Sequence, residues 1–343
     1  MNGAACLNTL SNRMRTLPIV ILYVTAGCNL RCMTCSFRDP LPQELSLEEY
    51  RKLAATLREL GLRHAVFSGG EPLLRRDFPD VVRMFDDQGI RKTLLTNGLL
   101  LEKRIAEIRG QFNEIIVSID GSKASTHDTI RGVRSFDRIV SGIGRLVQDK
   151  PRPLVSVRTV VQRNNFREIP DMVRLAKSLG VDRVSFLAAD VLSASFNRDR
   201  IGPVAPPEDI KLTAQECFEM KGIIGSVIEE FQLEISTGFL SKGHAKLHHL
   251  LQYFEALNGM AEFPRNVCNA PRVSAVINSM GEVLPCYFLP AYGNIRSDAL
   301  ADRINSDRAV LTRRQVQAYS LKQCQTCVCT LHVSPLSAIL DVW

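Results

Sequence analysis

Short apolar runs alternate with amphipathic segments along the first 190 residues. Six runs rich in Val, Ile and Leu predict buried strands, at 18–24, 64–68, 91–98, 113–121, 154–162 and 181–190. The segments between them have helical spacing and helix end signals, at 46–61, 77–89, 101–110, 135–149 and 168–180. Buried strands that alternate with helices are typical of an α/β fold with a parallel sheet covered by helices. Six such units are two short of a closed eight-unit barrel, so we predict a partial (β/α)6 TIM-like barrel over 18–190.

The remaining sequence has a different pattern and divides into two regions. Region 191–262 begins with a Pro-rich stretch, GPVAPPED, and contains two helical patterns, so we predict a linker and a helical segment. In 263–335, apolar positions alternate on either side of the turn NSMG, which predicts a β-hairpin. We therefore predict a second, small C-terminal α+β domain at 263–335.

Composition and charge exclude several classes of protein. The 343 residues are 45% hydrophobic and 23% charged, which is ordinary for a globular protein, and no apolar run is long enough to span a membrane. The first residues lack the apolar centre of a secretory signal, so we expect a cytoplasmic protein. The net charge of +7 is spread along the chain without a basic block, which gives no support for nucleic-acid binding.

The ten cysteines are concentrated in two groups. Three follow the first predicted strand and five lie near the C-terminus: Cys28, Cys32 and Cys35, then Cys268, Cys286, Cys324, Cys327 and Cys329. A long chain without a secretory signal is not a disulfide scaffold, so we interpret the groups as metal ligands in a reducing cytosol. Cys6 and Cys217 are isolated, and we expect a surface thiol and a small buried residue respectively.

Three thiolates within nine residues suit one kind of metal centre. Four would complete the coordination of a four-iron cubane, whereas three leave one iron free to bind a small molecule. A structural zinc ion is the alternative, but it needs a fourth ligand, and no His or Cys follows Cys35 before His64. Ligands collect at the carboxyl ends of parallel strands, where other notable residues also fall: Gly69, Gly70, Glu71, Asn97, Ser118 and Asp120.

The C-terminal cysteines have the spacing of a second metal site. Cys324 and Cys327 form a C-x2-C pair, and the predicted hairpin can bring Cys268 and Cys286 opposite them. These four complete a closed cluster and leave Cys329 over. A zinc site with four thiolates is the alternative, because zinc accepts the same ligands.

The pattern Cys28-x3-Cys32-x2-Cys35 after one strand, with Gly69-Gly70-Glu71-Pro72 after the next, resembles the radical S-adenosylmethionine (SAM) superfamily. The resemblance covers residues 18–190 and implies that the three cysteines hold a [4Fe-4S] cluster whose open iron binds SAM. Reductive cleavage of SAM then gives a 5′-deoxyadenosyl radical that abstracts hydrogen from a substrate. The family usually carries an aromatic residue just before the third cysteine, where this chain has Thr34, and Phe37 is our candidate replacement.

The resemblance also implies contacts to SAM at the glycine turn and the next strand. Gly69, Gly70 and Glu71 would face the SAM amine, with backbone carbonyls that glycine leaves accessible. A carboxylate that ties its own loop together is the alternative role of Glu71. Asn97 would reach the ribose or cap its own turn.

Further contacts to SAM are implied on the fourth and fifth strands. Arg158, with Ser118 beside it, would bind the SAM carboxylate, and a structural ion pair between Arg158 and Asp120 is an equal alternative. Asp120 itself remains a candidate cofactor contact at the end of its strand. His127 and Arg131, in the stretch HDTIRG, are expected to be mainly structural.

The pattern C-x12-G-x4-C followed by C-x2-C resembles the twitch and SPASM C-terminal domains of radical SAM enzymes. A complete SPASM domain has more cysteines and holds two auxiliary clusters, so the resemblance implies a twitch-like domain with one auxiliary [4Fe-4S] cluster. Cys329 would replace Cys327, ligate an incomplete second cluster or carry no metal.

These features predict a cytosolic radical SAM enzyme. We expect an oxidation or a cross-linking of a small metabolite or a peptide, with the auxiliary cluster positioning the substrate or accepting an electron. The electron donor would be a flavodoxin or ferredoxin. The alternatives are a non-catalytic iron–sulfur electron carrier and a zinc-bearing scaffold protein, neither of which needs a three-cysteine site beside a glycine turn.

Overall fold

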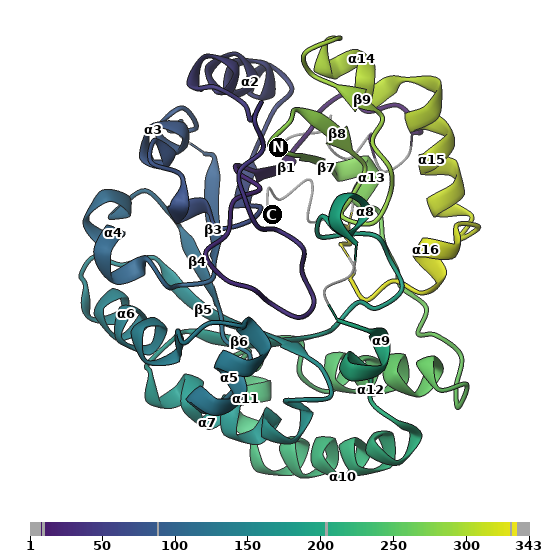
Figure 1. Ribbon diagram of the computed structural model, residues 1–343. Helices are drawn as coiled ribbons and strands as arrows, with labels where there is room; N and C mark the ends of the chain where they lie inside the picture. Colours follow the sequence, from purple (N-terminus) through teal and green to yellow (C-terminus); the bar gives the residue numbers. More distant parts are fainter. Residues whose placement is uncertain (1–7, 9–10, 88, 203–204, 330, 335–343) are drawn as a thin grey trace.

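The structure, a computed structural model, describes residues 8, 11–87, 89–202, 205–329 and 331–334. Its centre is one nine-stranded sheet with the strand order β6-β5-β4-β3-β2-β1-β7-β8-β9 (Figure 1). Strands β1 to β6 are parallel neighbours in chain order, and β6 does not pair with β9 to close the sheet. The predicted partial (β/α)6 barrel is confirmed. Cys6 lies outside the described residues.

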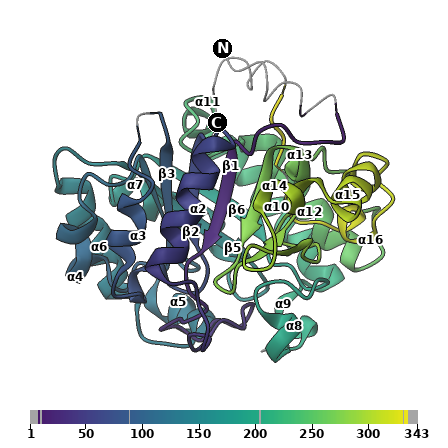
Figure 2. The same ribbon diagram turned by 90° about the horizontal axis from the view of Figure 1, so that it is seen from above.

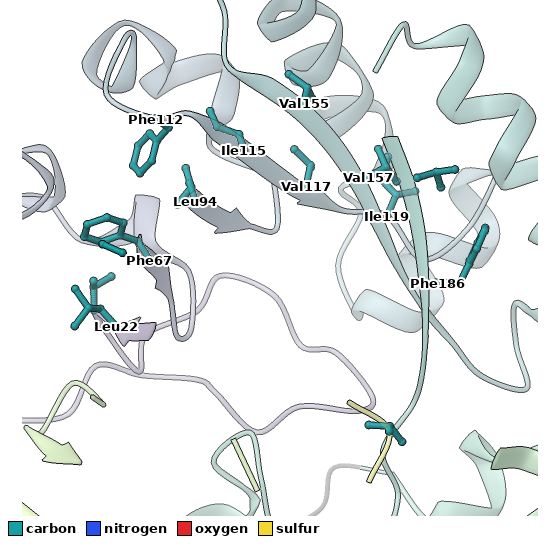
Figure 3. Packing of buried hydrophobic residues seen from close by; sticks show 14 of the residues in the cluster. Leu22, Phe67, Leu94, Phe112, Ile115, Val117, Ile119, Val155, Val157 and Phe186 are labelled. Carbon is teal, nitrogen blue, oxygen red and sulfur yellow. The ribbon is translucent and has the colours of Figure 1, made fainter. Parts of the chain in front are cut away.

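The six barrel strands occupy the predicted runs. They are β1 (Ile19–Tyr23), β2 (His64–Ser68), β3 (Arg91–Thr96), β4 (Glu114–Ser118), β5 (Leu154–Val161) and β6 (Arg183–Ala188). Alternate residues of each strand point toward the helices, where a large apolar core includes Leu22, Phe67, Leu94 and Val157 (Figure 3). The residues between them face the barrel interior.

A helix follows each of the first five strands and covers the outer face of the sheet. These helices are α2 (Leu47–Glu59), α3 (Phe78–Arg83), α4 (Leu101–Ile108), α6 (Phe136–Gln148) and α7 (Ile169–Ser178). The predicted capping box of Ser46 and Glu49 starts α2. Helix α3 is shorter than the predicted 77–89, and an unpredicted helix, α5 (Ala124–Arg131), contains the stretch HDTIRG.

The C-terminal hairpin extends the barrel sheet. β7 (Ser274–Ile277) pairs in parallel with β1, with Ser274 opposite Ile19, and the antiparallel strands β8 (Glu282–Leu284) and β9 (Gly293–Asn294) follow. The predicted hairpin is therefore present, but its sheet is continuous with the barrel. The sequence pattern did not reveal this pairing, because a short parallel strand has no local partner to indicate it.

Further helices follow β6, both before β7 and after β9. They are α8 (Arg198–Ile201), α9 (Pro207–Ile210), α10 (Ala214–Glu230), α11 (Gln232–Ser236) and α12 (Gly243–Leu257), followed by α13 (Ala270–Val273), α14 (Leu300–Asn305), α15 (Asp307–Gln317) and α16 (Lys322–Gln325). Helix α12 packs against β6 and α10, and Cys217 is buried within α10 as predicted. Figures 1 and 2 place α14 to α16 on the opposite side of the molecule from α4 and α6. Among the described helices, none is long and apolar enough to cross a bilayer.

A second, smaller apolar cluster lies on the inner face of β1. It combines Ile19 and Ile21 with Val276 of β7 and with Val333 near the end of the described chain. The backbone of residues 331–333 is held there by hydrogen bonds with Asn269. The C-terminal segment therefore packs against the barrel interior, which brings the last cysteines close to the barrel opening.

Candidate active site at the barrel opening

The loop after β1 brings three thiols together. Burial raises the pKa of Cys28 to about 11 and that of Cys35 to about 12, and the charge of the neighbouring Cys32 raises both further. Buried thiols of this kind ionise readily only when a cation stabilises the thiolates. We call these three residues the N-terminal cysteine site. Three mutually close thiols fit the protein ligands of a [4Fe-4S] cluster with one open iron.

The glycine turn after β2 packs directly on the cysteine loop. The Gly70 N–H donates to the Thr25 carbonyl at 2.8 Å, and the Glu71 N–H donates to the Gly27 carbonyl at 2.8 Å. A Cβ on Gly70 would lie 2.1 Å from the Gly27 oxygen, and Gly69 has a φ of +114°. Glycine is therefore required here by the close approach of two backbones, in addition to any contact with SAM.

Replacing Gly70 by alanine is expected to lower both SAM affinity and the iron content of the N-terminal cysteine site. The added Cβ must push the two loops apart, because the atom that it meets is backbone. Gly144→Ala is the matched control, since a Cβ on Gly144 meets nothing within 4 Å. Iron counting and SAM titration after anaerobic reconstitution check this. Wild-type values for both quantities in Gly70→Ala would show that the approach of the loops is dispensable.

Glu71 ties the loops after β2 and β3 together. Its fully buried carboxylate accepts hydrogen bonds from the Leu73 N–H at 2.9 Å, the Thr96 hydroxyl at 2.8 Å and the Asn97 N–H at 2.7 Å. Burial raises the pKa of Glu71 to about 7, although these three donors act in the opposite direction. Of the two roles considered for Glu71, the structure shows the structural one, and contact with the SAM amine remains a prediction.

Asn97 contacts the N-terminal cysteine site through its side chain. The Asn97 Nδ2 donates to Asn29 Oδ1 at 2.8 Å and lies 3.8 Å from the Cys28 sulfur. Its Oδ1 accepts from the Leu99 N–H at 2.9 Å, which is the predicted capping of its own turn. Asn97 thus fixes the loop after β3 against the cysteine loop, and a contact with the SAM ribose remains a prediction.

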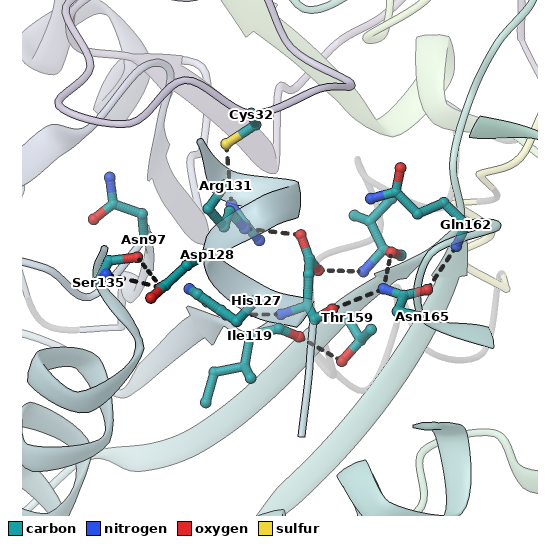
Figure 4. Close-up of polar contacts among 12 residues, drawn as sticks. Cys32, Asn97, Ile119, His127, Asp128, Arg131, Ser135, Thr159, Gln162 and Asn165 are labelled. Carbon is teal, nitrogen blue, oxygen red and sulfur yellow. Dashed lines mark hydrogen bonds and ion pairs between the residues drawn. The ribbon is translucent and has the colours of Figure 1, made fainter. Parts of the chain in front are cut away.

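Arg131 contacts both Asp120 and Cys32, and Figure 4 shows its side chain pointing toward Cys32. Its guanidinium lies 2.8 Å from Asp120 Oδ2, and its Nη1 lies 3.7 Å from the Cys32 sulfur. Asp120 also accepts from the Val160 N–H at 2.8 Å. The alternative ion pair between Asp120 and Arg158 is therefore wrong, because Arg131 occupies the carboxylate. This ion pair fits the structural role predicted for Arg131, and a donor beside a sulfur also stabilises the thiolate form of Cys32.

Ser118 and Arg158 lie opposite each other in the register of β4 and β5, as expected. Arg158 faces the barrel interior, and its Nε lies 3.4 Å from the Ser185 hydroxyl on the next strand. Because Asp120 pairs with Arg131, the SAM carboxylate is the remaining proposed partner of Ser118 and Arg158.

The five C-terminal cysteines line a single cavity. Burial raises the pKa of Cys286 to about 12, and the charges of Cys268 and Cys324 raise it further. The charges of Cys286 and Cys268 likewise contribute to the raised pKa of Cys327. We call Cys268, Cys286, Cys324 and Cys327 the C-terminal cysteine site. The hairpin and the C-x2-C pair meet at this cavity, as the sequence predicted, and the donor set fits a four-iron cluster.

Cys329 also lines this cavity. Its N–H lies 3.4 Å from the Cys327 sulfur, so it donates to a residue of the C-terminal cysteine site. Burial raises the pKa of Cys329, and the nearby cations Lys246 and Arg158 act against that rise. Whether Cys329 itself binds metal remains a prediction.

Tyr23 lies between the two cysteine sites. Its ring packs edge-on against Phe37 at 5.7 Å and stacks on Tyr287 at 6.2 Å. Burial and the Tyr287 hydroxyl raise the pKa of Tyr23, and charges on Cys35 and Cys286 contribute as well. The sequence analysis did not single out Tyr23, although strand alternation places it on the inner face directly before the cysteine loop.

A cavity of about 530 Å³ opens beside this tyrosine. Its aromatic walls come from the cysteine loop, the loop after β6 and the segment after β8: Tyr23, Phe37, Phe196, Tyr287 and Phe288. The volume lies within the usual range for small-molecule sites. The cavity is therefore large enough for a metabolite or for a few residues of a peptide.

Neither cysteine site has the tight convergence of a single-ion centre. In the described part of the chain, no three His, Cys, Asp or Glu side chains approach closely enough to hold one metal ion. Each thiolate of a cubane binds a different iron, so its ligands stand further apart than those of zinc.

Comparison with protein families and known proteins agrees with this site. The radical SAM superfamily matches residues 22–176, and an iron–sulfur cluster-binding domain, SPASM, matches residues 268–328. An AdoMet-dependent heme synthase of Methanosarcina barkeri is 28% identical over 82% of this chain and 81% of its own. A PqqA peptide cyclase of Bradyrhizobium diazoefficiens is 24% identical over 90% of this chain and 78% of its own.

Solved structures show the same fold. Streptococcus suis SuiB bound to the precursor peptide SuiA has a TM-score of 0.64 at 16% identity, covering 94% of this chain and 75% of SuiB. The anSMEcpe enzyme with AdoMet and a bound peptide has a TM-score of 0.61 at 16% identity, covering 94% and 95%.

Fold and site together define an enzyme with one iron–sulfur cluster at the mouth of an open barrel and further cluster binding near the C-terminus. The chain belongs to the radical SAM superfamily and carries a SPASM/twitch-type C-terminal domain. Its cofactors are a [4Fe-4S] cluster with SAM and auxiliary iron–sulfur binding in the C-terminal domain.

Proposed function

We propose that this enzyme cleaves SAM at the N-terminal cysteine site and oxidises or cross-links a small metabolite or a peptide bound in the barrel opening. The observation that carries the proposal is the position of Tyr23, whose ring packs on Phe37, two residues after Cys35, and on Tyr287, next to Cys286. A substrate in the adjoining cavity would contact Phe37 and Tyr287, which are near neighbours in sequence of Cys35 and Cys286. Such an arrangement suits a net two-electron oxidation.

When bound, the first cluster with SAM supplies a hydrogen-abstracting radical, and the second cluster supplies an electron acceptor. The protein's own side chains shape the region between the two cysteine sites. Tyr23, Phe37 and Tyr287 form an apolar wall that excludes water from the region between the sites. Arg131 orients Cys32, and Glu71 holds the loops after β2 and β3 in place. The proposed contacts to SAM are Gly69, Gly70, Glu71, Asn97, Ser118 and Arg158.

The names of the relatives support more than one kind of substrate. Their names include a heme synthase and a peptide cyclase, and SuiB is bound to a precursor peptide. A flavodoxin or ferredoxin is the proposed electron donor, and the cytoplasm the proposed location, because the thiols must stay reduced.

Incubating the reduced, reconstituted enzyme with SAM tests the proposal. We expect 5′-deoxyadenosine and methionine to form slowly without substrate, as chromatography of the products would show. Their absence from a preparation with about eight irons per chain, the content of two cubanes, would refute the enzymatic function and favour an electron carrier.

A further inference from the structure

A cavity of about 370 Å³ opens beside α13 and α15, two helices that pack against each other (Figure 2). No described residue lines both this cavity and the aromatic cavity beside Tyr23, so the two are separate. Its described lining residues include no aspartate or glutamate, but three arginines and one histidine: Arg265, Arg272, Arg313 and His332. A hollow with one sign of charge attracts ligands of the opposite sign.

Hydrogen bonds to one asparagine hold two of these arginines close together. The Arg272 Nη2 donates to Asn12 Oδ1 at 2.8 Å, and the Arg313 Nε donates to the Asn12 backbone carbonyl at 2.6 Å. The Arg313 Nη1 also lies 3.4 Å from the carbonyl oxygen of Pro271, the residue before Arg272. The two guanidinium groups are therefore near neighbours, and their like charges repel each other.

Both arginines are buried, with 7% of Arg272 and 1% of Arg313 exposed. In the described part of the chain, Arg313 donates only to backbone carbonyls, and its Nη2 has no hydrogen-bond partner there. Arg131, another buried arginine, pairs with the Asp120 carboxylate at 2.8 Å. A buried cation without a carboxylate is costly, so an anion from solution would stabilise Arg313.

We propose that this cavity binds a ligand with a phosphate group, held by Arg272 and Arg313 with the more exposed Arg265 and His332 beside it. Guanidinium groups bind phosphate oxygens through paired N–H donors. A phosphate carries more charge than a carboxylate and suits several converging cations better. The cavity volume lies in the range of small-molecule sites, so it has room for more than the phosphate itself. This site goes beyond the proposed reaction and does not depend on it.

The cavity adjoins the C-terminal cysteine site. Cys268 lines both this cavity and the cavity of the five cysteines, and so do Pro271 and Tyr319. A ligand in the cavity would therefore bind beside a proposed cluster ligand. Binding must for this reason be measured on the reconstituted enzyme.

Two other roles of these arginines have to be separated from ligand binding. Arg272 and Arg313 connect Asn12 to α13 and α15, which requires no anion. Outside the described ranges the sequence has one acidic residue, Asp341, and its carboxylate is the competing candidate anion. The experiment therefore includes a variant for each role.

The test compares phosphate binding by Arg313→Gln and by wild type, both reconstituted with iron and sulfide. Glutamine keeps an amide donor for the Asn12 carbonyl and removes the charge. Arg314→Gln is the matched control, because Arg314 is the next residue of α15 but is exposed and does not line the cavity. Inorganic phosphate is the probe and acetate the comparison, each titrated by isothermal calorimetry after circular dichroism has shown a folded protein.

We expect wild type and Arg314→Gln to bind phosphate saturably and acetate more weakly. Arg313→Gln should bind phosphate at least about tenfold more weakly, a loss of about 1.4 kcal/mol. Its iron content and slow SAM cleavage should equal those of wild type, because none of the proposed contacts to SAM lines the cavity. Should Arg313→Gln fail to fold, Arg265→Gln replaces it. Arg265 is exposed on the cavity wall, so the fold tolerates this change, and phosphate affinity should again fall.

Several results would overturn the phosphate site. No phosphate binding by wild type, or equal affinity in the folded variant and in wild type, removes its basis and leaves the arginines their contacts with Asn12. Acetate binding as tight as phosphate binding would refute the choice of phosphate. Phosphate binding that appears only in Asp341→Asn would assign the cations to the chain's own carboxylate. SAM cleavage tests the proposed function independently of all these results.

Discussion

Cys32→Ala is expected to abolish SAM cleavage and to remove about four irons per chain, one cubane's worth. Cys32 is the most enclosed of its group, with 9% of its surface exposed, and its sulfur is the one that Arg131 approaches. Two remaining thiols cannot hold a cubane in a site that needs three. The loss should therefore be complete at the N-terminal cysteine site while iron at the C-terminal site remains.

Cys217→Ala is the matched control for this experiment. Cys217 is fully buried in α10, so its loss also removes a buried sulfur, but it lies in neither cysteine site. Its iron content and SAM cleavage should equal those of wild type. Retained cleavage in Cys32→Ala, measured as 5′-deoxyadenosine, would remove Cys32 from the ligand set.

Replacing Cys268 and Cys286 together by alanine is expected to remove about four irons while slow, substrate-free SAM cleavage continues. The N-terminal cysteines take no ligand from the C-terminal site, so their cluster should survive. Turnover of the true substrate should stop, because the cavity beside Tyr287 loses the group that positions substrate or accepts its electron. Iron counting, 5′-deoxyadenosine assays and substrate turnover check the three parts.

A stability control is essential for this double variant. Metal binding contributes to folding of cysteine-ligated units, and β7 of the hairpin is paired with β1. Circular dichroism must therefore show a folded barrel before cleavage is compared, with Cys217→Ala again as the reference. Full iron content in the folded double variant would exclude these cysteines as ligands, whereas normal substrate turnover without that iron would make the second cluster merely structural.

The sequence predicted the barrel and the place of its site because both depend on local information. Strand and helix periods are properties of short windows, and parallel strands place their following loops at one edge. Cys28, Asn97 and Glu71 therefore meet as expected, although they are far apart in the chain. The cysteines proposed as cluster ligands could be predicted for the same reason, because their spacing lies within single loops.

Partner choice among charged side chains was not predictable in the same way. The sequence offered Arg158 as the cation beside Asp120, whereas the structure has Arg131 there, because α5 places that residue beside the carboxylate. Tyr23 can be recognised as part of the site only from its stacking on Tyr287, which the C-terminal sheet brings beside it.

The pairing of β1 with β7 has a consequence for how this protein is made. β1 is the first barrel strand to leave the ribosome and β7 is formed from the last quarter of the chain, so one edge of β1 stays unpaired during most of synthesis. Contacts between such distant segments form late, because closing a long loop precedes any gain from pairing. The cysteine loop follows directly after this strand. A ribosome-bound chain that stops before β7 therefore presents an open strand beside three free thiols, which makes it a target for aggregation and oxidation before either cluster can be inserted.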